Sequence, residues 1–129
     1  MNVKPVKPKK ISKSWGYELW LANNKDNNYC GKILSIRERC STSMHFHVNK
    51  HETFYVLEGI LKIQILNTET ASTEELVVVQ GDTYEINRAI PHKLIAMNGP
   101  VKFIEVSTFH EDSDSYRLYR ELPEQLSIT

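Results

Sequence analysis

The sequence predicts an all-β protein with a single core, and three observations support this prediction. The length of 129 residues is usual for one domain. Hydrophobic residues at 40% and charged residues at 25% are ordinary for a globular chain, which excludes a disordered or collagen-like protein. From about Trp15 onward, apolar and polar residues alternate in short runs bounded by turn residues. This period of two is typical of a sandwich or barrel of short strands.

Each strand is predicted from its own alternation. The clearest case is the segment in which Leu61, Ile63 and Ile65 alternate with Lys62 and Gln64, so one of its faces is solvated. In chain order the other expected strands are Tyr17–Ala22, Tyr29–Ile36, Ser43–His47, Glu52–Glu58, Glu75–Val79, Thr83–Ile86, His92–Ala96 and Val101–Thr108. Turn residues separate them, as in Gly81-Asp82 and Asn98-Gly99-Pro100. Only the tail, Asp114–Leu126, suits a short C-terminal helix, which Pro123 limits.

The charge distribution bears on partners and on location. Sixteen basic and sixteen acidic residues cancel, so the sequence predicts no nucleic-acid partner. Basic residues crowd the start, where Pro5 and Pro8 interrupt them, so residues 1–13 are expected to be a basic extended arm and residues 14–129 the β-domain. We expect no membrane partner and a cytoplasmic location, because no apolar stretch approaches the roughly 18 residues of a membrane span. Cys30 and Cys40 lack a CxxC spacing and are interpreted as reduced thiols.

The segment from Ser43 to Glu52 holds the densest cluster of residues able to carry chemistry. Side chains two apart on a strand share a face, so His45 and His47 point to the same side. A neighbouring strand can return Glu52 to that point, at the end of an apolar stripe containing Phe54 and Val56. A carboxylate there is costly as a bare charge and well suited as a metal ligand.

His92 is the natural fourth ligand, since it begins a later strand directly after Pro91. A His-x-His pair alone is as well explained by a surface strand, and a histidine after proline by a turn. The four residues together favour one divalent transition metal, such as Mn, Fe, Co, Ni or Zn. An octahedral ion would keep two positions open for substrate or water.

These residues carry a resemblance to a known family. The pattern His45-x-His47-x4-Glu52-x6-Gly59 resembles the first cupin motif, and Gly81-x10-His92 resembles the second. The resemblance implies a cupin-type jelly roll, also called a double-stranded β-helix. The chain departs from the pattern at Arg39 and Ala89, where glycines are expected, at Asn87, where proline is expected, and at Ala96 in place of asparagine. These departures affect turns more than metal ligation.

A narrower resemblance extends over most of the chain. Trp15-Gly16, Lys32-x-Leu34-x-Ile36, the segment from Ser43 to Glu52, Ile104-Glu105-Val106 and Asp112-x-Asp114-x2-Arg117 are similar to the metal-dependent cupin domain of type II phosphomannose isomerases. That family tends to carry Gln at the position of His45 and Arg at that of Lys50. The resemblance implies aldose–ketose isomerisation of a hexose phosphate, of the mannose 6-phosphate type, at a divalent metal.

Such an isomerase needs a general base and groups that bind phosphate. Three residues are candidates for the base: His51, Glu105 and Lys50. His51 is equally well explained as an exposed loop residue, and Glu105 by a buried cation partner such as Arg117 or Lys32. The candidates for substrate binding are Arg88, Lys93 and Arg117.

Two other functions stay open. A non-haem iron oxygenase could use the same four ligands, and a non-catalytic cupin could bind only a metal, a sugar or a partner protein. We expect the partner of this protein to be a small-molecule substrate or ligand, and we expect that molecule to be a sugar or a sugar phosphate. Because jelly rolls of this size have exposed sheet edges, we expect a homodimer, with the strand near Trp15–Leu21 at its interface.

Overall fold

The computed structural model describes residues 4–119 and confirms the all-β prediction. The strands in chain order are β1 (Lys9–Lys13), β2 (Gly16–Asn24), β3 (Tyr29–Ile36), β4 (Met44–His47), β5 (Glu52–Glu58), β6 (Ile60–Leu66), β7 (Thr73–Val79), β8 (Thr83–Ile86), β9 (His92–Ala96), β10 (Val101–Ser107) and β11 (Ser115–Tyr119). One turn of 3₁₀ helix, η1 (Asp112–Asp114), precedes β11. None of the helical residues in the described range forms a segment long and apolar enough to cross a membrane.

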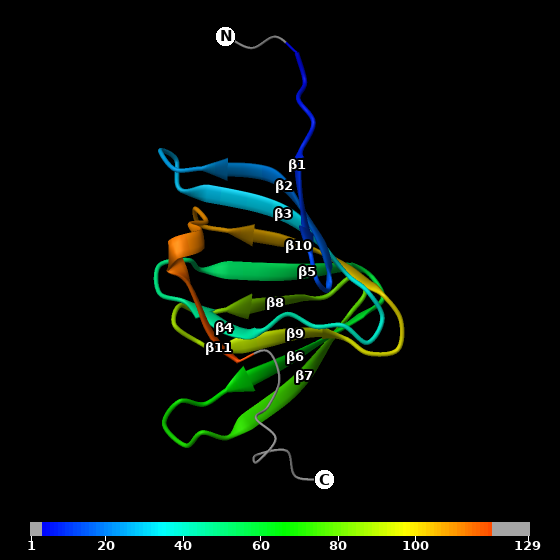
Figure 1. Ribbon diagram of the computed structural model, residues 1–129, viewed down its shortest axis with the longest axis vertical. Helices are drawn as coiled ribbons and strands as arrows, with labels where there is room; N and C mark the ends of the chain where they lie inside the picture. Colours follow the sequence, from blue (N-terminus) through cyan, green and yellow to red (C-terminus); the bar gives the residue numbers. More distant parts are fainter. Residues whose placement is uncertain (1–3, 120–129) are drawn as a thin grey trace.

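The strands form two antiparallel sheets, which make up the jelly roll. The six-stranded sheet has the order β1-β2-β3-β10-β5-β8, and the five-stranded sheet has the order β11-β4-β9-β6-β7. In Figure 1, β2 and β3 lie at the upper end of the molecule, and β6 and β7 lie at the lower end. Strands distant in sequence therefore become neighbours, as β3 and β10 do. Because strands distant in sequence pair in this way, β4, β5 and β9 all line the same interior of the jelly roll.

The core follows from the alternation seen in the sequence. Phe54 and Val56 of β5 are buried whereas Tyr55 between them is exposed, because successive side chains point to opposite faces. Phe54 packs edge to face on Phe103 of β10, with ring centroids 5.3 Å apart. The rest of the buried apolar cluster comes from both sheets and includes Leu34, Ile36, Leu61, Ile63, Leu94, Ala96 and Val101.

The two departures from the cupin glycine pattern keep the backbone that glycine favours. Arg39 has φ of 63° and Ala89 has φ of 62°, both in the left-handed region. Hydrogen bonds hold them there, since Arg39 N–H donates to Ala96 O and Ala89 N–H donates to His47 O, each at 2.7 Å. The loop conformation is therefore retained, at a cost of about 1–2 kcal/mol for each residue that carries a Cβ.

Two strands differ from the sequence-based expectations. β1 takes residues 9–13 of the expected extended arm and pairs them with β2, so this part of the arm is an edge strand. β11 occupies the start of the segment for which a short helix is expected, and it pairs with β4. The expected helix is therefore wrong over Ser115–Tyr119, where edge pairing satisfies the backbone instead. Residues 120–126 of that segment lie outside the described range.

Candidate functional site

The four groups expected to hold a metal lie together at one end of the interior. β4 carries His45 and His47, β5 begins at Glu52, and β9 begins at His92, which pairs directly with His45. The ligand atoms of the three histidines all lie within 4.8 Å of one another. Glu52 Oε2 is 3.1 Å from His92 Nε2 and 3.7 Å from His47 Nε2. The strand parity that grouped these residues in the sequence therefore brings them to one point.

Each histidine has its ring oriented by a backbone carbonyl. The Nδ1 atom lies 2.8 Å from Ser43 O in His45, 2.8 Å from Ile90 O in His92 and 3.3 Å from Asp114 O in His47. Because a carbonyl only accepts, each neutral ring carries its proton on Nδ1 and leaves the Nε2 lone pair directed into the site. Metal-binding histidines are oriented in this way by their outer partners.

The charge states of these groups also suit a cation. Burial, followed by the neighbouring His92, lowers the pKa of His45 to about 3, and burial lowers the pKa of His47 as well. Burial by itself raises the pKa of Glu52, but the Lys50 ammonium together with His92 and His47 outweighs it and holds that pKa well below its usual value. The site therefore offers neutral imidazoles at His45 and His47 and an ionised carboxylate at Glu52 at neutral pH.

Two atoms of the site lack a hydrogen-bond partner, which tests the fit of a metal more directly. Within the described residues, Glu52 Oε2 and His92 Nε2 are buried and accept or donate no hydrogen bond. A carboxylate oxygen and an imidazole lone pair 3.1 Å apart repel each other unless a positive charge is bound by both. Three nitrogens and one oxygen are a donor set that Mn, Fe, Co, Ni and Zn accept. The residues present therefore fit a divalent transition metal.

Lys50 lies at the centre of a buried network of charged and polar side chains beside these ligands. Its Nζ lies 2.8 Å from Glu105 Oε2, 3.5 Å from Glu52 Oε1 and 3.1 Å from His110 Nδ1. Burial lowers the pKa of Lys50, but Glu105 and Glu52 outweigh it and raise that pKa above its ordinary value. Lys50 is thus a fixed ammonium, and it is the cation that pairs with Glu105. The buried cation beside Glu105 is therefore Lys50, and not Arg117 or Lys32 as expected from sequence.

His110 and Asp112 are site residues that sequence reasoning missed. The Nε2–H group of His110 donates to Asp112 Oδ1 at 2.8 Å, while Nδ1 accepts from Lys50. Burial, followed by Lys50, lowers the pKa of His110. His110 lies in the connection after β10, and Asp112 is the first residue of η1. Two sequence signals were present: a His-x-Asp pair shortly after Glu105, and the place of Asp112 in the Asp112-x-Asp114-x2-Arg117 motif.

The other residues singled out in the sequence divide between the cavity and the outer surface. Arg117, Lys50 and Glu105 line the cavity in the structure of residues 4–119. His51 lies outside this lining and pairs with Glu85, with His51 Nε2 2.7 Å from Glu85 Oε2. Arg88 also lies outside it, where its Nε–H donates to Asn49 O, and Lys93 is half-buried outside the lining.

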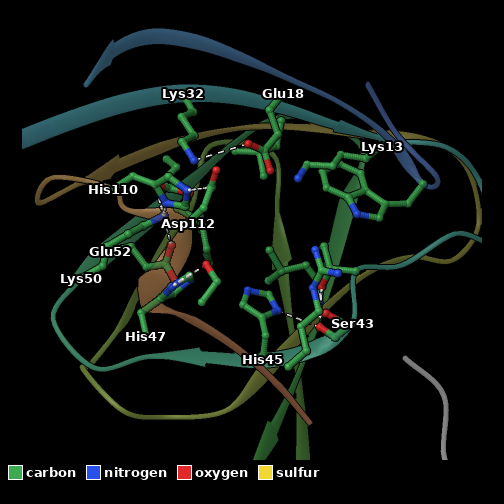
Figure 2. A pocket seen from close by; sticks show the side chains of 18 of the residues that line it. Lys13, Glu18, Lys32, Ser43, His45, His47, Lys50, Glu52, His110 and Asp112 are labelled. Carbon is green, nitrogen blue, oxygen red and sulfur yellow. Dashed lines mark hydrogen bonds and ion pairs between the residues drawn. The ribbon is translucent and has the colours of Figure 1, made fainter. Parts of the chain in front are cut away.

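His45, His47 and Glu52 open onto a polar cavity of about 780 Å³ (Figure 2). This volume is within the range usual for small-molecule sites. Four cations and four carboxylates line it: Lys13, Lys32, Lys50 and Arg117, and Glu18, Glu52, Glu105 and Asp112. These charges cancel, so a bound divalent metal would leave the wall with a net charge of +2.

The comparisons with known proteins agree with this geometry. Residues 33–107, more than half of the chain, match the family model described as "Cupin domain". The chain belongs to the cupin family. A comparison with curated protein sequences gives no match for this cupin.

Solved structures share the fold of this cupin at low sequence identity. Oxalate decarboxylase from Bacillus subtilis at pH 4.6 superposes with a TM-score of 0.75 and 16% identity, over 86% of this chain and 30% of that one. CapF with the inhibitor 3-isopropenyl-tropolone superposes with a TM-score of 0.75 and 15% identity, over 87% of this chain and 34% of that one. The cupin described here thus spans about a third of the length of these structures, and the likeness concerns the fold.

Asp114 fixes the loop that joins two of the metal-facing strands of this cupin. Its buried carboxylate accepts hydrogen bonds from the N–H groups of Val48, Asn49 and Lys50 at 3.0 to 3.2 Å. Its carbonyl orients His47. The loop between His47 and Glu52 is therefore anchored to η1.

We expect Asp114→Asn to weaken metal binding about tenfold, because an amide nitrogen facing three N–H donors would release the loop. Competition with a chelator of known affinity measures this change. Asn67→Ala is the control, since it removes an exposed turn cap that accepts from Glu69 and Thr70 and does not line the cavity. Equal metal affinity in Asp114→Asn and the wild type would contradict the anchoring role.

The depressed pKa of His45 predicts acid sensitivity of the metal-free protein. Between pH 6.5 and about 3, the unfolded chain takes up a proton at His45 that the folded chain does not. This contribution to stability is therefore complete above pH 6.5 and is lost progressively as the pH falls, by about 1 kcal/mol per pH unit. Urea unfolding between pH 7 and pH 5 measures it. His45→Gln has no proton to take up, so its profile should be flatter; equally steep profiles would disprove the assignment.

Proposed function

We propose that this cupin binds one divalent transition metal through His45, His47, Glu52 and His92, and that it isomerises a sugar phosphate between aldose and ketose. The observation that carries the proposal is the convergence of three imidazoles and one carboxylate beside a polar cavity with room for a small molecule. The resemblance to type II phosphomannose isomerases supplies the reaction class. Neither solved neighbour reaches an identity that would add to it.

The charge of the cavity supports an anionic substrate. The side chains that line it sum to zero, so the metal ion would leave two positive charges uncompensated. A phosphate monoester carries close to two negative charges at neutral pH and would restore the balance. Hydroxyl groups of a sugar suit the remaining lining, which includes Thr42, Ser43 and Ser115.

The metal, when bound, would supply a Lewis acid that polarises the substrate carbonyl and the neighbouring hydroxyl. The proton transfer between adjacent carbons then needs a base. We assign it to Glu105, whose Oε2 is held by Lys50 at 2.8 Å and by the Ser107 hydroxyl at 2.9 Å while the side chain lines the cavity. Lys50 orients this carboxylate. His51, at its position beside Glu85, is outside the cavity and is not assigned a step.

A direct experiment tests the proposal. The protein is purified without added metal, its metal is identified by elemental analysis, and the loaded protein is screened against a panel of aldose and ketose phosphates. We expect turnover in the wild type, and its loss in Glu105→Gln with the metal content unchanged. Absence of interconversion across the panel would overturn the isomerase, and strict dependence of turnover on Fe(II) and O₂ would replace it with the oxygenase.

The homodimer and the cytoplasmic location also remain proposals. The homodimer is supported by the position of β1 at the edge of the six-stranded sheet, where one side of the strand pairs with no other described strand.

A further inference from the structure

We propose that the β1–β2 turn forms a subsite for the phosphate group of the substrate, with Lys13 as its central cation. The inference rests on the proposed function, since the same substrate would contact the metal at its other end. It assigns a role to one lysine of the basic N-terminal segment, which by sequence alone is simply a solvated arm.

The turn lies on the cavity wall across from the metal ligands. Ser12, Lys13, Ser14 and Trp15 all line the cavity. In Figure 2, Lys13 points into the cavity from the side opposite His45 and His47, next to Glu18 and Lys32. The cavity therefore has two ends, here called poles. The candidate metal ligands form the first pole, and Lys13 of β1, Glu18 of β2 and Lys32 of β3 form the second pole. A substrate that spans the cavity would place one end at each pole.

Lys13 is the cation of the second pole that forms no close ion pair, and its charge acts on Glu18 and Asp112 only at longer range. It is half-buried, and no carboxylate of residues 4–119 forms an ion pair with it within 4.0 Å. The two nearby carboxylates are already engaged. Glu18 accepts from Trp20 Nε1 at 2.9 Å and pairs with Lys32 at 3.4 Å, and Asp112 accepts from His110 at 2.8 Å.

Lys32 differs from Lys13 in this respect. Its ammonium is 2% exposed, pairs with Glu18 and lies 4.5 Å from the centre of the Trp20 ring. Lys32 is therefore held as part of the wall, whereas the Lys13 ammonium is available to a ligand.

The groups around Lys13 are those that a phosphate monoester requires. Ser12 and Ser14 belong to the same wall, and a serine hydroxyl can donate to a phosphate oxygen. Arg117 of β11 adds a further cation to the lining. A monoester, with close to two negative charges, matches the net charge of the metal-loaded cavity better than a single carboxylate does.

The test compares two lysines of the same strand in the metal-loaded protein. Lys13→Gln removes the cavity cation, and Lys10→Gln removes an equal charge from β1 at a lysine that lies over the Tyr17 ring and does not line the cavity. We expect Lys13→Gln to raise KM for mannose 6-phosphate by about tenfold or more, with kcat and metal affinity nearly unchanged. Lys10→Gln should match the wild type, and turnover of free mannose should be equal in all three proteins.

Each result decides one question. Equal KM values for Lys13→Gln and Lys10→Gln would overturn the subsite while leaving the isomerase intact. If no protein turns the sugar phosphate over, the isomerase fails. Calorimetric titration with mannose 6-phosphate then tests the subsite alone: weaker binding in Lys13→Gln supports it, and equal or absent binding in both proteins rejects it.

Discussion

Replacing His92 with alanine will lower the affinity of the protein for divalent transition metals by more than the roughly 10- to 100-fold that follows loss of an outer partner. His92 is 1% exposed, so no solvent-exposed group or water can take its place without rearrangement. The variant removes one of the four candidate metal ligands, the one whose Nε2 lies 3.1 Å from Glu52 Oε2. Isothermal titration with Mn, Co and Zn in turn measures the loss.

His51→Ala is the matched control for this prediction. It also removes one imidazole, one residue away from Glu52, but from a side chain paired with Glu85 outside the cavity. Its metal affinity should equal that of the wild type. Similar metal affinities in His92→Ala and His51→Ala would contradict the assignment of His92 as a metal ligand.

Replacing Lys50 with methionine will destabilise the metal-free protein by about 3–5 kcal/mol, the usual cost of removing one partner of a buried ion pair. Glu105 and Glu52 are both 3% exposed and would lose the ammonium that lies 2.8 Å and 3.5 Å from their oxygens. The pKa of Glu52, which the Lys50 ammonium helps to lower, would then rise. The loss should therefore shrink as the pH falls and Glu52 takes up a proton.

The double variant Lys50→Met with Glu105→Leu separates charge from packing. If the unpaired carboxylate causes the loss, the double variant will be more stable than Lys50→Met alone. Urea unfolding at pH 7 and pH 5 measures both effects. A double variant whose loss equals the sum of the two single losses would disprove the coupling. Adding metal should also restore part of the stability of Lys50→Met, since the ion replaces the charge beside Glu52.

The alternation of apolar and polar residues predicted most strands because it reports local burial. The bounds of β3, β5, β8 and β9 agree with those expected from sequence. β1 and β11 were missed although the edge strands β7 and β8 were predicted: β1 has Ile11 as its single apolar residue, and residues 116–118 of β11 are all exposed. Their formation depends on pairing with a neighbour, which a local pattern does not record.

The same division applies to the site. Parity within a strand grouped His45 with His47, and Glu52 and His92 followed from apolar stripes at strand starts. The contacts of Lys50 with Glu105 and His110 and the anchoring by Asp114 could not be predicted, because they join residues about 60 positions apart in sequence. The left-handed backbone at Arg39 and Ala89 shows the reverse case, in which fold constraints override residue preference.

Anomalous diffraction from crystals of the metal-loaded protein tests the central claim most directly. The account predicts one strong peak bonded to Nε2 of His45, His47 and His92 and to a carboxylate oxygen of Glu52, at about 2.0–2.2 Å for zinc. A peak elsewhere on the molecule, or density that leaves any of these four side chains outside bonding distance, would contradict it.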